Sequence, residues 1–516
     1  MQKLPIGIQS FEKIRLGNYL YVDKTKQILQ LIQNGECYFL SRPRRFGKSL
    51  TISTLEAMFK GKAELFKGLY AEDWVKEQSK HPSPVIKIDM SCLGSYENKK
   101  ELNDSIINYL ENFIYLNDLS ISSEIDASKM LFNLIIRLYK QFGQVVVLID
   151  EYDKPITDNL NNLEKAEEMR ESLSKFYIVL KGCPYLKFVM LTGVSKFSKT
   201  GVFSSLNNLS DISMDEEYSD IVGYTQEELE KYFIDWFEKP MKKYSLNREE
   251  FIAKIEDYYD GFSFDGTVRL YNPFSVLNFF KQGYFDNYWY DSAMPSFLAK
   301  YLKEHKIKEP KEYIQKKVYS GFTNSHEIES TSVESFLYQA GYLTISERKG
   351  NILILDYPNE EVRSSMDRLF LENFYNVKDD AEFSNDIWES LESENIPQIV
   401  NIFNEALKGV PYDDYKDRDE SWYRSLFLML LSGAKITYFS EVHTFRGRSD
   451  VVVTFKDKLV VVIEFKFAPT SKDVDKKRQE GEEQIKSRDY ASAYKSIKKI
   501  ITAVFVADDE KRQVVV

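Results

Sequence analysis

The first candidate for chemistry is the segment Ser41-Arg-Pro-Arg-Arg-Phe-Gly-Lys-Ser49, which follows an apolar run and precedes a helical pattern. Gly47 lets the backbone pass close to an anion, and the ammonium of Lys48 could reach the β and γ phosphates of a nucleotide. The hydroxyl of Ser49 is placed to ligate Mg²⁺. The generic phosphate-loop pattern has glycine where this chain has Arg42, so an ordinary strand-to-helix turn is the alternative for this segment alone.

An acidic pair further along the chain supports nucleotide binding. The apolar run Val145-Val-Val-Leu-Ile149 predicts a strand buried on both faces, and it ends in Asp150 and Glu151. In a phosphate-binding site, Asp150 would hold Mg²⁺ through water and Glu151 would polarise the attacking water. Thr192 ends a third predicted strand and could sense the γ-phosphate. The alternative is a buried strand that ends in an incidental acidic turn.

The second candidate for chemistry is a predicted β-hairpin, in which two apolar runs flank the polar turn 456–458. If Phe455 pairs with Leu459, the register places Asp450 directly opposite Glu464. Two facing like charges destabilise a sheet unless a cation joins them, and carboxylate oxygens suit Mg²⁺ or Mn²⁺. The hairpin therefore predicts a metal site.

Lys466 adds an ammonium to the same patch, because it lies two residues after Glu464 and its side chain points to the same face of the sheet. Our hypothesis is that Asp450, Glu464 and the carbonyl of Phe465 hold the metal. Lys466 would then orient, and help to deprotonate, the water that attacks a phosphodiester. The alternative is an amphipathic surface hairpin with a solvated Glu–Lys pair.

The elements that would position these residues alternate between strand-like and helix-like segments from 37 to 192, which predicts βαβ units and a parallel sheet covered by helices. A mostly helical region rich in aromatic residues follows, which could include a winged-helix-like domain. Beyond it the pattern predicts a helical connector, and then helix, strand, strand, helix and strand. The predicted fold class is therefore α/β multi-domain, with a P-loop parallel-sheet ATPase, a helical middle region and a C-terminal α/β domain. The predicted domains are 1–215, 216–345, 346–410 and 411–516.

The composition limits the classes of protein to which the chain can belong. It has 516 residues, of which 43% are hydrophobic and 14% aromatic, so we expect several packed cores. The net charge of −11 counts against a surface covered with phosphate-binding Lys and Arg, although a local basic patch is compatible with it. Three distant cysteines, Cys37, Cys92 and Cys183, predict neither a disulfide framework nor a zinc site and favour the cytoplasm. Neither a secretory signal nor a membrane-spanning stretch is predicted.

Four segments resemble a known bacterial family, the AAA-ATPase-like proteins that carry a PD-(D/E)XK nuclease domain at the C-terminus. They are Tyr21-Val-Asp-Lys-Thr25, Arg42-Pro-Arg-Arg-Phe-Gly-Lys-Ser49, Ile149-Asp-Glu-Tyr-Asp153 and Leu191-Thr-Gly-Val-Ser195. The resemblance covers essentially the whole chain. The arginine-rich loop with one glycine is the family's own form, and it is also similar to the loop of signalling ATPases of the STAND type. The resemblance implies an ATPase, with Arg45 among the nucleotide-binding residues.

The hairpin resembles the D…(E)xK arrangement of the same nuclease superfamily, which implies a restriction-endonuclease-like α/β fold. By this resemblance, Glu420 is the upstream acidic residue on the helix before the hairpin. Gln484 is the accessory polar residue on the helix after it, with Tyr490 beyond. Ser449 stands where the signature of the superfamily has proline.

Two hypotheses of function follow from these motifs. The first is an ATP-regulated nuclease that uses Mg²⁺, or Mn²⁺ in its place, to cleave DNA in genome maintenance or in defence against foreign DNA. The rival is a nucleotide-switch protein whose C-terminal module binds nucleic acid or a protein partner without cutting. The complete set of Asp450, Glu464 and Lys466 favours the first, and the acidic overall charge favours the second. Nucleic acid is the expected partner, and binding to a membrane is not expected. Formation of a homo-oligomer is left as an open alternative.

Overall fold

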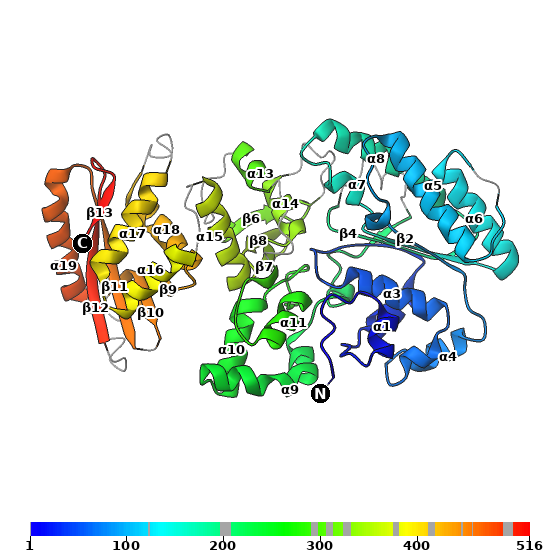
Figure 1. Cartoon of the computed structure of the whole chain (residues 1–516), viewed down its shortest axis with the longest axis horizontal. Coiled ribbons are helices and arrows are strands. Elements are labelled where there is room, and N and C mark those ends of the chain that lie inside the picture. Colours follow the sequence, from blue (N-terminus) through cyan, green and yellow to red (C-terminus); the bar gives the residue numbers. More distant parts are fainter. Residues whose placement is uncertain are drawn as a thin grey trace. The chain divides into compact units, whose positions relative to one another are not determined.

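The structure is a computed structural model, and it describes residues 2–121, 124–196, 208–289, 298–305, 313–323, 332–374, 381–410, 418–444, 447–456, 458–488 and 499–516. The chain forms two compact units, shown with their elements in Figure 1: Met1–Phe297 with Glu312–Val362, and Leu298–Lys311 with Arg363–Val516. The predicted α/β multi-domain class is confirmed, whereas the four predicted domain boundaries stay a prediction. No helix in the described ranges combines the length and the apolar character that crossing a bilayer requires.

A five-stranded sheet forms the framework of the first unit. Its strands are β1 (Cys37–Ser41), β2 (Val85–Asp89), β3 (Val145–Asp150), β4 (Leu186–Gly193) and β5 (Ser210–Asp211). They stand in the order β2-β3-β4-β1-β5, and every pairing is parallel, so their carboxyl ends meet at one edge. The predicted parallel sheet is confirmed. The strand before the glycine loop, β1, is separated only by β4 from the strand with the acidic end, β3.

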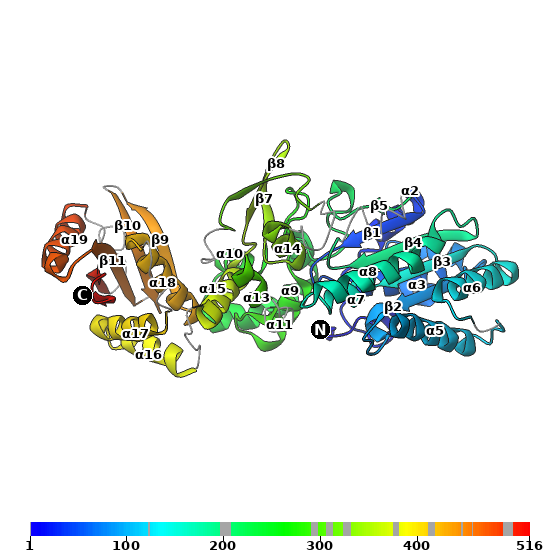
Figure 2. The ribbon, with the colours of Figure 1, turned by 90° about the horizontal axis from the view of Figure 1, so that it is seen from above.

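Helices cover both faces of this sheet. The helices of this part of the chain are α1 (Phe11–Leu16), α2 (Thr25–Asn34), α3 (Lys48–Phe59), α4 (Glu72–Gln78), α5 (Lys99–Leu116), α6 (Ala127–Phe142), α7 (Lys154–Thr157) and α8 (Leu163–Tyr177), of which α1, α2 and α4 pack against α3. Val145, Val147 and Ile149 of β3 share one core with α5, α6 and α8, of which α5 and α6 lie side by side (Figure 2). Val146 and Leu148 are buried on the opposite face, because side chains alternate along a strand, and α3 packs against β2, β3 and β4.

The middle region of the first unit combines helices with a small antiparallel sheet in the order β6-β8-β7. Its elements are α9 (Gln226–Tyr244), α10 (Arg248–Tyr259), α11 (Pro273–Gln282), β6 (Lys316–Tyr319), α14 (Val333–Ala340), β7 (Thr344–Lys349) and β8 (Ile352–Asp356). Capping boxes at Thr225 and Asn247 start α9 and α10, and Phe280 stacks on Phe233 and Phe237 between the helices. The predicted helical character is confirmed, and the structure adds the sheet, whose strand β7 ends in the polar run 346–349.

The second unit is built around a five-stranded mixed sheet in the order β13-β12-β11-β10-β9. The elements from the end of the first unit onward are α15 (Glu360–Phe374), α16 (Ala381–Glu392), α17 (Ile396–Gly409), α18 (Glu420–Gly433), β9 (Thr437–Thr444), β10 (Gly447–Phe455), β11 (Leu459–Ala468), α19 (Val474–Arg488), β12 (Lys499–Asp508) and β13 (Gln513–Val515), and α13 (Leu298–Glu304) also belongs to this unit. The pattern predicted two strands between α18 and α19, whereas the structure has three. The missed strand, β9, lies at the edge of the sheet with Phe439 52% exposed, so it lacks the alternation of a half-buried strand.

Candidate nucleotide site and metal centre

The phosphate-loop candidate connects β1 to α3 at the carboxyl edge of the parallel sheet. Gly47 adopts a left-handed conformation (φ 98°) and directly precedes α3, whose first backbone N–H groups have no partner within the helix. A Cβ atom added at Gly47 would meet nothing within 4 Å. The backbone is therefore open at the point where a phosphate has to approach the helix N-terminus.

Lys48 is buried and folds back onto its own loop. Its Nζ donates to the carbonyls of Arg42 (2.8 Å) and Pro43 (2.9 Å). Burial lowers the pKa of Lys48, and the nearby carboxylates of Asp150 and Glu151 oppose this shift. The ammonium thus lies between the loop and the acidic strand end, where phosphate oxygens could replace the carbonyls as its partners.

The acidic pair lies at the carboxyl end of β3, next to β4, which carries Thr192 one residue before its end. The hydroxyl of Thr192 donates to Oδ1 of Asp150 at 2.6 Å. Glu151 has a positive φ of 51°, and burial, followed by the charge of Asp150, raises its pKa. The structure therefore brings Asp150, Glu151 and Thr192 together near the charge of Lys48.

The two arginines singled out in the loop point to the middle region. The guanidinium of Arg45 lies over the ring of Phe274, 4.9 Å from its centre. Arg42 is 1% exposed, donates to the carbonyl of Ser213 and lies 4.1 Å over the ring of Phe264, and burial lowers its pKa to about 10. An arginine can therefore stand where the generic pattern has its first glycine, because the side chain of Arg42 points out of the loop. The predicted nucleotide-binding role of Arg45 stays a prediction.

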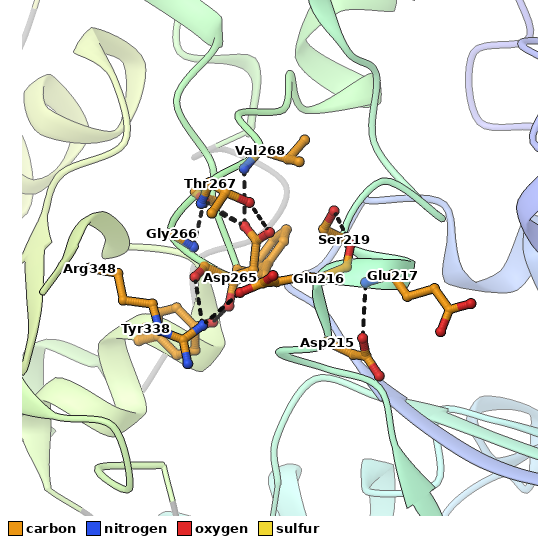
Figure 3. Close-up of polar contacts among 12 residues, drawn as sticks. Asp215, Glu216, Glu217, Ser219, Asp265, Gly266, Thr267, Val268, Tyr338 and Arg348 are labelled. Atoms are coloured by element: carbon orange, nitrogen blue, oxygen red, sulfur yellow. Dashed lines mark hydrogen bonds and ion pairs between the residues drawn. The ribbon is translucent and has the colours of Figure 1, made fainter. Parts of the chain in front are cut away.

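Contacts from the middle region hold the loop in a way that no sequence motif indicated. The indole N–H of Trp289 donates to the carbonyl of Arg44 at 3.2 Å, and Gly341 packs directly on Pro43. Figure 3 shows a further link, in which Nη1 of Arg348 reaches Glu216 (3.3 Å), in the segment after β5, and the carbonyl of Asp265 (3.5 Å). The loop is therefore packed between the parallel sheet and the middle region.

A cavity of about 60 Å³ adjoins Gly47 and was also missed from the sequence. Its lining comes from the N-terminal segment, from α2 and α3, and from the start of the middle region, which are far apart in the sequence. The lining residues are Pro5, Ile14, Leu20, Tyr21, Val22, Lys24, Ile28, Phe46, Gly47, Leu50, Thr51, Thr54, Ile221, Val222, Gly223, Tyr224 and Pro273. The ion pair of Lys24 with Glu228 (2.6 Å) ties α9 to this lining. Small-molecule sites usually enclose roughly 300 to 1,000 Å³, so this mostly apolar cavity is too small to hold a nucleoside as it stands.

In the second unit, the predicted hairpin register is confirmed. Phe455 pairs with Leu459, and the same register continues along the strands to Val451 and Ile463. One residue further, Oδ2 of Asp450 accepts the backbone N–H of Phe465 at 2.8 Å. The two strands therefore bring Asp450 next to the Glu-Phe-Lys segment of β11.

The residues at this end of the hairpin form a compact charged cluster. The Nζ of Lys466 donates to Oε1 of Glu464 (2.8 Å) and to the carbonyl of Phe465 (2.9 Å). Glu464 is 1% exposed, and its Oε2 is buried without a hydrogen-bond partner among the described residues. Burial, together with the charge of Asp450, raises the pKa of Glu464. Lys466 thus lies against two of the three oxygen-bearing groups that were predicted to hold a metal.

These residues fit a divalent cation through oxygen atoms. An orphaned buried carboxylate oxygen beside a second carboxylate and a backbone carbonyl is a donor set that suits Mg²⁺ or Mn²⁺. Within the part of the chain that the structure describes, no group of three or more His, Cys, Asp or Glu side chains is gathered closely enough to hold a metal. Any metal site here therefore depends on the two carboxylates and the Phe465 carbonyl.

The neighbouring helices supply further polar groups. Glu420 lies in the first turn of α18, and burial raises its pKa, while the charge of Lys466 lowers this pKa and the charge of Asp450 raises it. Arg424, one turn later, donates from Nη1 to Oδ1 of Asp450 at 2.8 Å. Sequence reasoning missed Arg424, because no motif marks it. Gln484 lies on α19, which packs against β11 and β12, and Tyr490 lies outside the described residues.

The chain is similar to known proteins and protein families. A family model described as a predicted AAA-ATPase matches residues 5–203, and one described as the PD-(D/E)XK nuclease superfamily matches residues 418–516. An uncharacterised protein in the vnfD 5′ region of Azotobacter chroococcum mcd 1 is 36% identical over 510 residues, covering 96% of this chain and 94% of the relative. The crystal structure of Cdc6p from Pyrobaculum aerophilum matches at 12% identity and a TM-score of 0.20, over 68% of this chain and 94% of that one. The chain belongs to the bacterial family of predicted AAA-ATPases that carry a C-terminal domain of the PD-(D/E)XK nuclease superfamily.

Proposed function

We propose that the first unit binds ATP with Mg²⁺ and hydrolyses it. Support comes from the buried ammonium of Lys48, which lies near the acidic end of β3 and at the start of α3. On binding, Lys48 would exchange its loop carbonyls for the β and γ phosphates. Ser49 would ligate Mg²⁺, and Asp150 would hold the ion through water.

Two further groups would act on the γ-phosphate. Glu151 would polarise the attacking water, and its raised pKa suits a group that accepts a proton. Thr192, held by its hydrogen bond to Asp150, would sense whether the γ-phosphate is present.

Titration calorimetry with ATP and Mg²⁺ tests this assignment. Lys48→Met should remove binding, because the phosphates lose their buried ammonium. Glu151→Gln should retain nucleotide and lose turnover. A wild-type protein that binds no ATP contradicts the assignment.

We infer that the second unit is a divalent-metal-dependent nuclease domain that cleaves phosphodiesters, with DNA as the expected substrate. The observation that carries this inference is Oε2 of Glu464, which is buried beside Asp450 without a hydrogen-bond partner among the described residues. Arg424 and Lys466 offset two of the three negative charges that Glu420, Asp450 and Glu464 carry when ionised, and a bound cation would offset the remainder. Asp450, Glu464 and the Phe465 carbonyl would hold Mg²⁺ or Mn²⁺, which supplies Lewis-acid stabilisation of charge on the phosphate. Lys466 would orient the attacking water, while Glu420 and Gln484 would support the site.

Titration calorimetry with Mn²⁺ tests the metal site. The wild-type protein should bind Mn²⁺, and both Asp450→Asn and Glu464→Gln should lose this binding. Glu392→Gln is the matched control, because Glu392 is an exposed carboxylate of the same unit that is paired with Lys456. Equal Mn²⁺ affinity in all four proteins contradicts the metal site.

A second candidate function is a nucleotide switch whose C-terminal module binds nucleic acid or a protein partner without cleavage. It is favoured by the fact that both oxygens of Asp450 already accept hydrogen bonds, from Arg424 and from the N–H of Phe465. A module of this kind would bind DNA and leave it intact when Mg²⁺ or Mn²⁺ is present.

We propose further that nucleotide occupancy controls the nuclease domain. Support comes from Trp289, which contacts the loop carbonyl of Arg44 and also donates its backbone N–H to Glu361 at 2.7 Å. Glu361 lies in the first turn of α15, a helix that begins in the first unit and continues into the second. Coupling of two sites needs an element with two arrangements that both ligands bias, and α15 is the candidate. Equal cleavage rates with ATP, with ADP, without nucleotide and in Lys48→Met would contradict this control.

A further inference from the structure

Arg424 forms a contact at the metal centre that the nuclease motif does not include. Its Nη1 donates to Oδ1 of Asp450 at 2.8 Å, while Oδ2 of the same carboxylate accepts the N–H of Phe465 at 2.8 Å. Both partners are largely shielded, with side chains 16% and 12% exposed, so the pair is weakly screened by solvent. Asp450 therefore has both oxygens engaged by protein donors.

The charges of the cluster show what a metal would change. Glu420, Asp450 and Glu464 contribute three negative charges when ionised, and Arg424 and Lys466 contribute two positive charges. A divalent cation bound to Asp450 places two positive charges beside the Arg424 guanidinium, and it competes for the same carboxylate oxygen. The pair between Arg424 and Asp450 and the bound cation therefore oppose each other.

The guanidinium of Arg424 is also suited to binding a phosphate group. Arginine binds phosphate through two parallel N–H groups, and this one extends to the same edge of the hairpin as Lys466. We propose that Arg424 holds Asp450 in the metal-free site, leaves it when a divalent cation binds, and then binds a phosphate of the nucleic acid. This makes Arg424 a positioning residue for substrate, and the inference rests on the proposed nuclease function.

The proposal predicts opposite effects of Arg424→Met on the two ligands. The variant should bind Mn²⁺ roughly fivefold more tightly than the wild type, because the competing cation is gone. With Ca²⁺ in place of Mg²⁺ to suppress cleavage, it should bind a DNA duplex roughly tenfold more weakly than the wild type. Without a metal the two proteins should bind the duplex equally, because the Arg424 guanidinium of the wild type is then bound to Asp450 and does not reach the DNA.

The experiment combines Mn²⁺ calorimetry with duplex titrations in Ca²⁺ and in a chelator, on the full chain. Lys456→Met is the matched control, because it removes one positive charge from the turn of the same hairpin, where Lys456 pairs with Glu392. Arg424→Lys keeps the charge but cannot form the bidentate contact, so it should retain wild-type Mn²⁺ affinity and part of the duplex binding.

Three results would overturn the proposal. The first is Mn²⁺ binding by Arg424→Met that is no tighter than in the wild type, which means that Arg424 supports Asp450 as a ligand. The second is a loss of duplex binding in Arg424→Met that is equal with and without Ca²⁺. An absence of any loss in both conditions would overturn the proposal too, because Arg424 would then pair with another group, such as Glu420 one turn away, and not with the DNA. A wild-type protein that binds no Mn²⁺ refutes the nuclease proposal itself, so the two failures are distinguishable.

Discussion

Gly341 is the position at which one added methyl group would press on the phosphate loop. It ends α14 with φ 93°, and a Cβ atom there would lie 2.7 Å from Cβ of Pro43 and 3.1 Å from Cζ2 of Trp289. An alanine in the left-handed region costs roughly 1 to 2 kcal/mol, and forcing extra volume into a packed site costs roughly 1 to 3 kcal/mol more. Gly341→Ala should therefore destabilise the first unit by about 2 to 5 kcal/mol.

Gly350 provides the matched control. It also has a positive φ, 62°, but a Cβ atom there would meet nothing within 4 Å. Gly350→Ala should cost only the backbone strain of roughly 1 to 2 kcal/mol. Urea denaturation measures this difference, and ATP calorimetry should show weaker binding in Gly341→Ala alone, because the added methyl group would displace the phosphate loop at Pro43.

The reasoning is refuted if the two alanine variants have the same denaturation midpoint and the same ATP affinity. That result would mean that the loop yields to the methyl group without cost. In that case the middle region does not hold the loop in its binding conformation.

Two further predictions concern single polar groups of the first unit. Trp289→Phe removes the hydrogen bond to the Arg44 carbonyl, so ATP binding should weaken roughly fivefold, and unchanged affinity in calorimetry would count against this contact. Burial raises the pKa of Asp260 from 3.8 to about 6, so the folded state binds the proton of Asp260 more tightly than the unfolded state does. The stability that the protonated carboxyl contributes is therefore lost as the pH rises from about 4 to 6. A shift of about two units corresponds to about 3 kcal/mol, so Asp260→Asn should be the more stable protein at pH 7 by up to that amount, and an equal pH dependence of unfolding in the two proteins would contradict the shift.

Local sequence patterns predicted those parts of both sites that are formed by residues close together in the sequence. The β-branched run before Asp150 and the glycine before Lys48 each specify a strand end or a helix start, and the structure contains both. The hairpin register followed from the position of one polar turn, because a side-chain period of two leaves little freedom once Phe455 pairs with Leu459.

The rest depends on contacts between residues that are far apart in the sequence. Trp289 and Gly341 reach the phosphate loop across more than two hundred residues, and their sequence surroundings do not indicate a partner. Arg424 lies on an amphipathic helix where a charged residue usually faces solvent, so its pairing with Asp450 follows only from the packing of α18 against β11. The edge strand β9 was missed because its exposed face carries Phe439 and hides the alternation.

The central claim is that the second unit cleaves phosphodiesters with a divalent cation held by Asp450 and Glu464. The most direct test is the incubation of purified full-length protein with supercoiled plasmid and Mn²⁺, with and without ATP, beside Asp450→Asn and the control Glu392→Gln. The account predicts that the wild type and Glu392→Gln convert the plasmid to nicked or linear forms at a rate that depends on nucleotide, and that Asp450→Asn leaves it supercoiled. A wild-type protein that leaves the plasmid intact in every nucleotide state, or an Asp450→Asn variant that cuts as fast as the wild type, would contradict the account.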